Sequence, residues 1–580
     1  MFRPNKHHHQ GNLFGWQYIL NAKQYELLMK SAGYAFYNEI FCQIDESLFS
    51  VLYSKKYSAP NVAVNVLVGA ILLQYKYNWT EKELIEHLSF DVQTRIALGL
   101  SNFDVEAFSI RSLYNFKKRL AEYQLKTGVN LISLLFTFLT DQQITKYDVT
   151  TRIQRGDSVQ IGSHIQDYSR LSLLAEVLNR LHRCLSKEDQ AANEALFKPY
   201  LKGGQKYVYR LKSDKYTSCL AQIASHYRTL FILLYEEYHE NETFCLFERA
   251  LNDHFDFSYE RTQLADATIN VKENKDLGSD TLQSPDDPDA TFRGKRGEKH
   301  KGYTITGVET CDPNSDLNLL VAIDTNANNI DDSTILEQIL PDMLAMTEDL
   351  EEAHFDGGYG SEKVDEIAQE HDVNIVQTAL RGAIAKVNMD IIHADETLDQ
   401  TTSNQTDSVK VNCPNEAHPA VTAQKVNEKK GKLSYKAVFD LSICEQCPFK
   451  DHCPTKRERN KNKGVATFRF NQQYIHRQKR RTAQSKLPDE RKYLRSGVES
   501  TMRSFRRGET NKGKIKYRGL FNTELYANAM GIILNFERIY RHNVALLIIF
   551  WRFCCSAALL SALALKANRK TNKFILYPSA

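Results

Sequence analysis

The chain of 580 residues shows no secretion signal. Its first residues, MFRPNKHHHQGNLF, contain neither the apolar stretch nor the small-residue cleavage site of a signal peptide. We therefore expect a cytoplasmic protein. We also expect its eleven cysteines to be thiols or metal ligands and not disulfides.

An uninterrupted membrane span is also missing. Residues 543–565 approach the length of a span, but they carry Arg552 near the middle. A charge at the centre of a bilayer costs about 2.5–3.5 kcal/mol on insertion scales. We therefore expect a buried or terminal amphipathic helix here, with a peripheral membrane contact as the alternative.

The chain has little net charge, because the formal value is only +4. Its 42% of hydrophobic and 25% of charged residues are typical of globular proteins, and its length predicts two to four domains. The basic residues are nevertheless concentrated. Residues 477–518 contain fifteen Lys or Arg and four acids, interleaved with Tyr493, Met502 and Phe505. This pattern indicates a folded basic surface that faces phosphate.

The first 150 residues have mostly helical patterns. In residues 107–123, Ser109 is a natural N-cap, and one apolar stripe follows it: Ile110, Leu113, Phe116 and Leu120. The other side of this helix is basic, with Arg111, Lys117, Lys118 and Arg119. A helix-turn-helix DNA-binding domain and an ordinary helical bundle both fit this pattern.

The middle of the chain alternates between strand and helix patterns. Residues 151–163 predict a strand that contains Asp157, residues 190–270 predict helices, and residues 274–302 predict a loop. The clearest signal is a β-α-β unit. Its first strand ends at Asp356, and open α/β sheets place functional side chains at that end of a strand.

Residues 475–540 return to a helical pattern, and the segment RSGVESTMRSFRRG contains a single acid. At helical spacing, this Glu499 shares a face with Arg495, Arg503 and Arg506. An adjoining apolar stripe consists of Val498, Met502 and Phe505. A surface salt bridge is one explanation of Glu499. A metal site is the other, since Asp157, Asp356 and Glu499 could supply oxygen ligands for Mg²⁺ in phosphoryl transfer.

Three blocks favour the second explanation. RGDSVQIGSHI, FDGGYGSE and RSGVESTMRSFRRG, in this order, resemble the active-site blocks of bacterial insertion-sequence transposases of the DDE class. The branch with a Tyr-Arg-Glu-Lys signature is the most similar. Tyr493 is one position closer to Arg495 than that signature has it, and Arg506 stands where the signature has Lys.

The resemblance implies an α/β fold: a ribonuclease H-like catalytic core with a helical N-terminal domain and a Cys-bearing insertion before the last catalytic helix. It also implies a catalytic triad of Asp157, Asp356 and Glu499 that holds Mg²⁺ or Mn²⁺. DNA contacts are expected from these basic residues: Arg495, Arg503, Arg506, Arg111, Lys117 and Lys118.

The expected partners are the terminal inverted repeats and a target DNA, held by a homodimer on paired ends, with no small-molecule substrate. The expected location is the cytoplasm, in association with the nucleoid. The predicted domains are a helical DNA-binding domain, two parts of the catalytic core around a Cys-rich insertion, and a hydrophobic tail of unassigned role: 1–150, 151–390 (with the helical insertion at about 190–270), 391–470, 471–542 and 543–580.

Four cysteines form a separate signal. Cys413, Cys444, Cys447 and Cys453 have the spacing C-x30-C-x2-C-x5-C, and the CEQC pair is typical of tetrahedral zinc coordination. A structural Zn²⁺ is therefore predicted, with Cys413 or His452 as the fourth ligand. Reduced cysteines that merely cluster are the alternative.

The predicted function is a metal-dependent DNA transposase that cuts at the ends of its mobile element and joins them to target DNA. Two alternatives are a nuclease of the same fold and a catalytically inactive relic that binds DNA.

Overall fold

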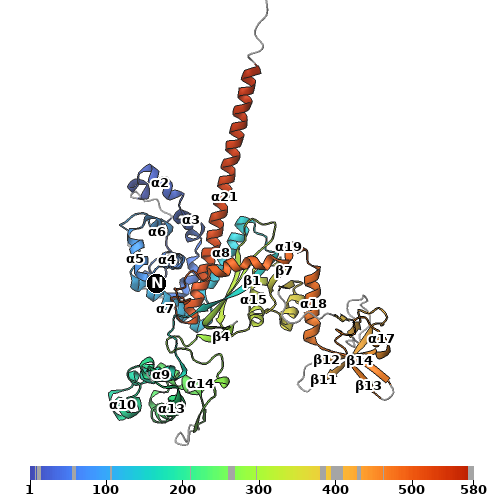
Figure 1. Ribbon diagram of the computed structural model, residues 1–580. Coiled ribbons are helices and arrows are strands. Elements are labelled where there is room, and N and C mark those ends of the chain that lie inside the picture. Colours follow the sequence, from blue (N-terminus) through green and yellow to red (C-terminus); the bar gives the residue numbers. More distant parts are fainter. Residues whose placement is uncertain are drawn as a thin grey trace, which may run out of the picture. The chain divides into compact units, whose positions relative to one another are not determined.

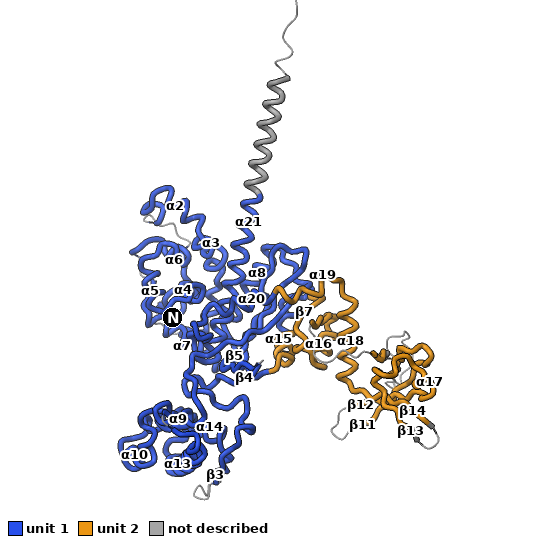
Figure 2. The backbone as a smooth tube through the Cα atoms, in the orientation of Figure 1, with its two compact units in different colours: residues 1–330, 341–349, 498–580 blue, residues 331–340, 350–497 orange. Residues whose placement is uncertain are grey.

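The computed structural model of the protein describes residues 1–6, 8, 15–54, 60–104, 107–209, 211–258, 268–295, 297–378, 387–393, 409–427, 433–460 and 463–571. The chain divides into two compact units (Figure 2). The first unit contains residues 1–330, 341–349 and 498–580, and the second contains residues 331–340 and 350–497. The predicted acids Asp157 and Glu499 belong to the first unit, and Asp356 belongs to the second.

The first unit begins with helices (Figure 1). They are α1 (Trp16–Ile19), α2 (Ala22–Met29), α3 (Ala32–Glu39), η2 (Phe41–Gln43), η3 (Glu46–Leu52), α4 (Val64–Tyr77), α5 (Glu81–Phe90), α6 (Val92–Ala97), α7 (Ile110–Thr127) and α8 (Leu131–Tyr147). Helix α7 begins at the predicted cap, because Ser109 accepts a hydrogen bond from the Ser112 amide. Its apolar stripe is buried except at Ile110, which lies in the first turn at the surface.

An antiparallel sheet follows. Its strands are β1 (Ile153–Gly162), β4 (Thr291–Lys295), β5 (Glu298–Thr310) and β6 (Leu320–Ala327). One edge of β5 pairs with β1, and the other edge pairs with β4 over its first residues and with β6 over the rest. Strand β4 and the start of β5 correct the prediction of a loop over residues 274–302. Polar residues form these strands because the pairing with each other supplies the backbone hydrogen bonds.

The long helix α21 (Leu520–Thr571) completes the core of the first unit (Figure 1). Its first half shares one hydrophobic cluster with α3, α4, α7, α8 and the sheet. Gly531 permits the close packing, since a Cβ there would lie 2.1 Å from Ile323 Cδ1 on β6. The buried Asn535 side chain accepts from the amide of Leu320 (2.7 Å) and donates to its carbonyl (2.9 Å).

The segment between β1 and β4 forms a helical lobe with its own core. The lobe contains α9 (Arg170–Cys184), α10 (Lys187–Ala192), α11 (Glu194–Phe197), α12 (Gly204–Val208), η4 (Ser213–Lys215), α13 (Tyr216–Tyr238), α14 (Glu242–His254), β2 (Phe255–Ser258), β3 (Thr268–Val271) and η6 (Asn274–Asp276). Leu, Tyr and Phe side chains fill this core. The prediction of helices over residues 190–270 is wrong at its end, because α14 ends at His254 and β2 and β3 pair with each other beyond it.

The second unit contains the predicted β-α-β unit. Strands β7 (Glu352–Asp356) and β8 (Asn374–Thr378) pair in parallel around α16 (Glu362–Glu370). Helix α15 (Asp332–Met346) contains Pro341, and the division between the units falls at this residue. Pro341 removes one backbone donor from the helix.

The Cys-bearing insertion of the second unit is a six-stranded antiparallel sheet in the order β13-β14-β12-β11-β10-β9. Its elements are β9 (Asp390–His393), β10 (Val409–Asn412), β11 (Val421–Asn427), β12 (Leu433–Asp440), α17 (Leu441–Glu445), β13 (Lys456–Asn460) and β14 (Lys463–Asn471). Three short helices follow: α18 (Gln472–Lys486), α19 (Asp489–Lys492) and η8 (Leu494–Gly497).

The continuous helical pattern of residues 475–540 is broken in the structure. Helix α18 ends before Pro488, because the preceding Leu487 is extended, as a residue before proline prefers. Helix α20 (Val498–Ser504) has only seven residues. Its end is held by Tyr526 of α21, whose hydroxyl donates to the Phe505 carbonyl (2.9 Å) and accepts from the Gly508 amide (3.1 Å).

Of the two helices expected for the tail, buried or terminal and amphipathic, the structure does not support the buried one. It continues α21, and four of its apolar side chains are largely exposed: Leu546, Leu547, Ile548 and Ile549, at 50%, 67%, 49% and 62%. Side chains from residue 550 onward lie outside the described ones. In the described part of the chain, no helix is both long and apolar enough to cross a membrane.

Candidate active site

Asp157 lies in the middle of β1, opposite Gly307 on β5. Directly opposed residues of antiparallel strands project from the same face of a sheet. A Cβ at Gly307 would lie 2.8 Å from Met502 Cε and 3.4 Å from Phe505 Cε2. The absence of a side chain at Gly307 therefore lets the segment that carries Glu499 approach the sheet on the face of Asp157.

Helix α20 packs through the predicted apolar stripe. Val498, Met502 and Phe505 are buried, and Glu499 in the first turn is exposed. Glu499 thus lies on a helix at the edge of the core, as the sequence predicts. The first unit brings the strand of Asp157 and the helix of Glu499 together.

A buried carboxylate fixes α20 to the sheet. Glu309 on β5 is 1% exposed and accepts from the Thr501 hydroxyl on α20 at 2.6 Å. It also accepts from Arg538 on α21 at 2.6 Å and from Arg155 on β1 at 2.7 Å. We call these four residues the Glu309 cluster. It ties four elements of the first unit to one another directly beside the Glu499 turn.

The charge of Glu309 is stabilised by its partners. Burial acts to raise the pKa of this carboxyl, but the charges of Arg538 and Arg155 and the hydrogen bond from Thr501 outweigh it. The pKa of Glu309 therefore lies below its ordinary value. The cluster contains two cations and one anion, so it adds positive charge next to α20.

Asp356 is the last residue of β7, as predicted. The turn after it is fixed by the backbone, since the Gly357 amide donates to the Thr378 carbonyl at 2.7 Å. Asp356 Oδ1 accepts a hydrogen bond from the Gly358 amide at 3.3 Å. The other carboxylate oxygen lies 3.9 Å from a guanidinium nitrogen of Arg495. The second unit thus places a predicted phosphate-binding arginine beside a predicted metal ligand.

The predicted arginine face is divided among three local structures. Arg495 lies in η8, Arg503 in α20, and Arg506 in the turn beyond α20, so the single helical face is wrong. Arg506 Nε donates to both carboxylate oxygens of Glu509, at 2.9 and 3.0 Å. Arg503 is exposed and has no ion pair among the described residues.

The basic side of α7 is also divided. Arg111 is exposed, and Lys118 is exposed with a carboxylate of Glu122 at 3.6 Å. Lys117 is largely buried and donates to Gln74 at 3.1 Å. Burial lowers the pKa of Lys117. Lys117 therefore packs against α4, whereas Arg111 and Lys118 face solvent.

The four cysteines of the predicted zinc site gather around α17. Cys444 and Cys447 are buried, and Cys413 and Cys453 are half-buried. Burial and the neighbouring thiols raise the pKa of Cys444 to about 11. Its sulfur also lies 3.3 Å from Nε2 of the buried His418.

No metal site is formed by these side chains as they stand. Within the described residues, no group of three or more His, Cys, Asp or Glu side chains is arranged to hold a metal ion. Neither the carboxylates nor the cysteines meet that condition, and zinc is therefore without structural support.

The Glu309 cluster is what the sequence did not predict. Its partners are separated by 154, 192 and 229 residues from Glu309, and no local spacing connects them. The only available signal is that Arg155 stands two residues before Asp157, on the same side of the strand.

Two family descriptions match the chain. One, a transposase domain (DUF772), matches residues 27–128, which contain α3 to α7. The other, a transposase DDE domain, matches residues 412–540, which contain β11 to β14 of the Cys-bearing sheet, α20 and Glu499. No curated protein matches the chain. The mixed α/β fold is compatible with such a domain, and DNA is the partner of this family. Together, these two matches indicate an insertion-sequence transposase of the DDE class.

Proposed function

We propose that this transposase cuts DNA at the ends of its mobile element and joins the freed ends to target DNA. The observation that carries the proposal is the packing of α20 on the sheet at Gly307. It places the helix of Glu499 on the face of β1 from which Asp157 projects. Carboxylates from separate elements at one position are what metal-dependent phosphoryl transfer requires.

In this proposal, Asp157, Asp356 and Glu499 hold one or two Mg²⁺ or Mn²⁺ ions. Their oxygen atoms suit these hard cations. A bound divalent ion would supply positive charge at the phosphate and a lower pKa for bound water. The core that carries the acids is proposed to be ribonuclease H-like, because the strands of Asp157 and Asp356 belong to an antiparallel and a parallel pair, respectively.

The chain's own cations are proposed to hold the DNA. Arg495 lies beside Asp356 and would bind the phosphate near that carboxylate. Arg503 is exposed one turn after Glu499 and would bind the adjacent backbone. Arg506 would contribute once it is released from Glu509. On α7, Arg111 and Lys118 face solvent and would contact the terminal repeats, whereas Lys117 supports the helix.

We further propose that two copies act on paired ends in association with the nucleoid. We also propose a structural Zn²⁺ at Cys413, Cys444, Cys447 and Cys453, because four thiols within one small sheet domain are the donor set that this ion prefers. The support for zinc is the chemistry of the donors alone.

A strand-transfer assay tests the function. Purified protein is mixed with a duplex that ends in the inverted repeat flanking the gene, a supercoiled target plasmid and Mg²⁺. We expect target molecules joined to the duplex. A nuclease of the same fold would give cut duplex without joined product, and a relic would give a DNA complex with neither. Either result would refute the proposal.

A further inference from the structure

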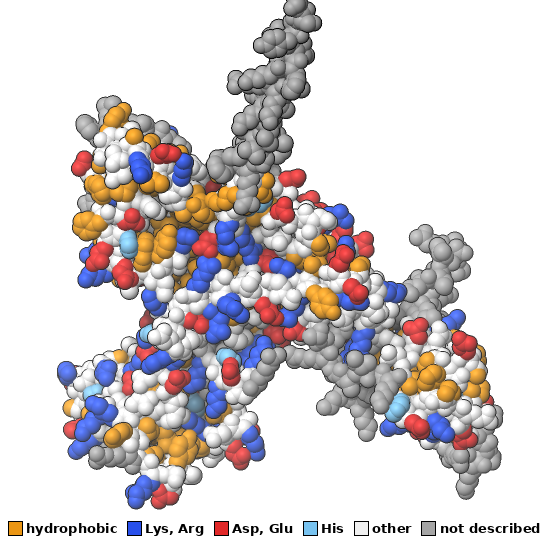
Figure 3. Space-filling model, turned by 45° about the horizontal axis from the view of Figure 1, so that its top comes forward, with side chains coloured by type: hydrophobic (Ala, Val, Ile, Leu, Met, Phe, Trp, Pro, Cys, Tyr) orange, Lys and Arg blue, Asp and Glu red, His pale blue; other side chains and the backbone are white. Residues whose placement is uncertain are grey.

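Charge is distributed unevenly over the helical lobe. Residues 198–215 contain six Lys or Arg and one acid, Asp214. Residues 236–256 contain seven acids and one base, Arg249. In the space-filling view, Lys and Arg side chains lie along the outer margin of this lobe (Figure 3). The lobe thus has one basic segment although its remaining surface is acidic.

The lysines of the basic segment have no partners among the described side chains. Its five lysines are exposed, and none makes an ion pair or side-chain hydrogen bond with the described residues: Lys198, Lys202, Lys206, Lys212 and Lys215. The other three lysines of the lobe are all engaged. Lys187 donates to Gln190 (3.4 Å), Lys272 to the Asn252 carbonyl (2.7 Å), and Lys275 pairs with Glu273 (2.8 Å). Apart from the exposed Arg183 of α9, the described cations of the lobe that make no ion pair or side-chain hydrogen bond are therefore concentrated in one segment.

This segment is anchored to the lobe. The Gly204 amide donates to Glu176 of α9 at 3.0 Å, and a Cβ at Gly204 would lie 1.9 Å from the Ser172 carbonyl oxygen. Only glycine permits this close approach. The fully buried Tyr200 hydroxyl lies 2.9 Å from Nδ1 of His226. The backbone is therefore fixed on α9 while the lysines extend into solvent.

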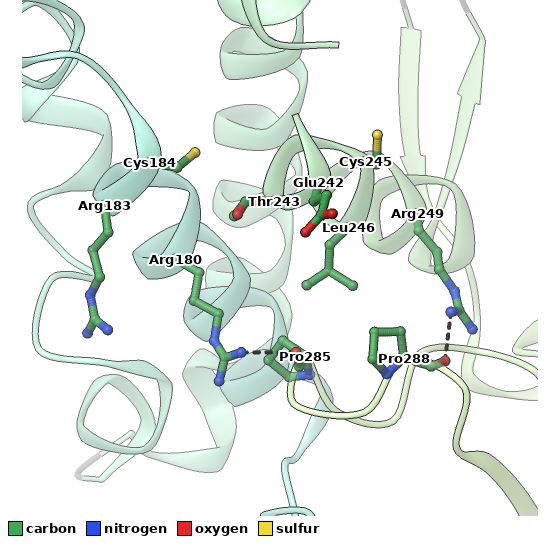
Figure 4. A pocket seen from close by; sticks show the side chains of 10 residues that line it. All are labelled: Arg180, Arg183, Cys184, Glu242, Thr243, Cys245, Leu246, Arg249, Pro285 and Pro288. Atoms are coloured by element: carbon green, nitrogen blue, oxygen red, sulfur yellow. Dashed lines mark hydrogen bonds between the residues drawn. The ribbon is translucent and has the colours of Figure 1, made fainter. Parts of the chain in front are cut away.

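The lobe's best-defined cavity offers an anion fewer free cations than the basic segment does. It has a volume of about 600 Å³ and lies between α9, α14 and the following loop. Arg180 donates to the Pro285 carbonyl (2.9 Å) and to Asp286 (2.7 Å), and Arg249 donates to the Pro288 carbonyl (2.7 Å) (Figure 4). These two arginines hold the loop. Arg183 also lines the cavity and makes no ion pair with the described residues, so the cavity offers one such cation where the basic segment offers five.

We propose that the basic segment, residues 198–215, is a second DNA-binding surface that contacts duplex backbone outside the terminal repeats. Five ammonium groups spread along an exposed surface match a row of phosphates and not one small anion. The ring of Tyr209, 77% exposed, lies in the same segment and offers an apolar face to a sugar. This proposal rests on the proposed function for the identity of the polyanion.

The test compares two double variants in the full chain. Lys202→Ala with Lys206→Ala removes two free lysines. Lys187→Ala with Lys275→Ala is the control, because it removes the same charge from lysines that already have partners. Binding to a random duplex is titrated at several salt concentrations, and equal melting temperatures establish that both variants are folded. Each lost phosphate contact lowers the slope of log affinity against log salt by about 0.9.

We expect the first variant to lower this slope by the amount that corresponds to one or two lost phosphate contacts, about 0.9–1.8. The control should leave the slope unchanged. Parallel slopes for wild type and the first variant would overturn the proposal. So would lysine-dependent binding to phosphatidylserine vesicles without any effect on DNA. The strand-transfer assay is read separately. A wild-type protein that joins no DNA but shows the slope change would refute the proposed function and leave this surface in place.

Discussion

At the scale of single residues, His254 shows how burial fixes a protonation state. It ends α14 and is 3% exposed, and neither ring nitrogen has a hydrogen-bond partner among the described residues. Burial, with the nearby charges of Arg170 and Lys272, lowers its pKa to about 3. The folded lobe therefore holds a neutral imidazole, whereas the unfolded chain takes up a proton near pH 6.5.

The sign of the pH dependence follows from this difference. The stabilising contribution of neutral His254 is fully present above pH 6.5. It is lost as the pH falls from there towards 3, by up to about 1.4 kcal/mol per pH unit. In wild type, the protection of α9 and α14 against hydrogen exchange should decrease between pH 7 and pH 5. In His254→Phe this decrease should be smaller. His239→Phe, at an exposed position, is the control. The same acid dependence in His254→Phe as in wild type would contradict this account.

Some residues of the candidate site can be placed from the sequence, and others cannot. Asp356 could be placed at the end of β7 because its strand, turn and helix are contiguous in the chain. Gly307 could not be selected, because its importance depends on Asp157 across the ladder and on Met502 above it. The three acids were selected by resemblance, since no spacing distinguishes them from other carboxylates.

At the scale of elements, α20 is too short to be stable by itself, so its position depends on tertiary contacts. The Glu309 cluster supplies a large part of them. Glu309→Gln leaves the half-buried guanidinium groups of Arg155 and Arg538 without their anion, and breaking a buried pair costs about 3 kcal/mol. We expect a lower melting temperature and slower cleavage, with DNA binding retained.

Two comparisons separate this effect from a general loss of charge. Glu298→Gln removes an 80% exposed carboxylate from the same strand and should change neither property. Because the pKa of Glu309 lies below its ordinary value, its contribution is present above about pH 4.5 and is lost as the pH falls through the folded pKa. Wild-type stability and cleavage in Glu309→Gln would show that the cluster does not position α20.

The Cys-bearing sheet makes a separate prediction. If its thiols bind zinc, freshly purified reduced protein contains about one zinc per chain. Cys447→Ser should then remove the metal and unfold this sheet, whereas Cys245→Ser, at an exposed cysteine of the lobe, should do neither. Elemental analysis decides the matter. Protein without zinc would leave the Cys444–His418 contact as the reason for the clustering.

Local patterns predicted several of the elements. Strand β1, helix α7 and the β7-α16-β8 unit form where periodicity and turn residues place them. Strand β4 was missed because its residues are polar and acquire strand structure by pairing with β5. The helix expected through residue 540 is interrupted first at Pro488 and again after α20, where the Gly508 amide donates to the hydroxyl of Tyr526, 18 residues further along the chain.

At the scale of the whole molecule, the helical pattern of the sequence ends near residue 150, where the first strand begins. One hydrophobic core nevertheless includes residues from both sides of this point. The helices of residues 27–128, which match the transposase domain (DUF772), share one hydrophobic cluster with α20, α21 and the sheet. Sequence patterns could not show this, because the cluster joins residues from both ends of the chain. The segment that matches the transposase domain (DUF772) and helix α20 are therefore joined through one hydrophobic core.

The central claim is that Asp157, Asp356 and Glu499 act as one catalytic set. The direct test is Mg²⁺-dependent cleavage of end DNA by Asp157→Asn, Asp356→Asn and Glu499→Gln, with end binding measured in parallel. Asp489→Asn, at an 89% exposed carboxylate ten residues before Glu499, is the control.

Loss of an outer-shell partner of a metal site costs about 10–100-fold in activity, so loss of a ligand should exceed the upper value. We predict cleavage more than about 100-fold slower in each of the three variants, near wild-type binding to the ends, and an unaffected control. Wild-type cleavage by any one variant would remove that residue from the set, and wild-type cleavage by all three would contradict the account.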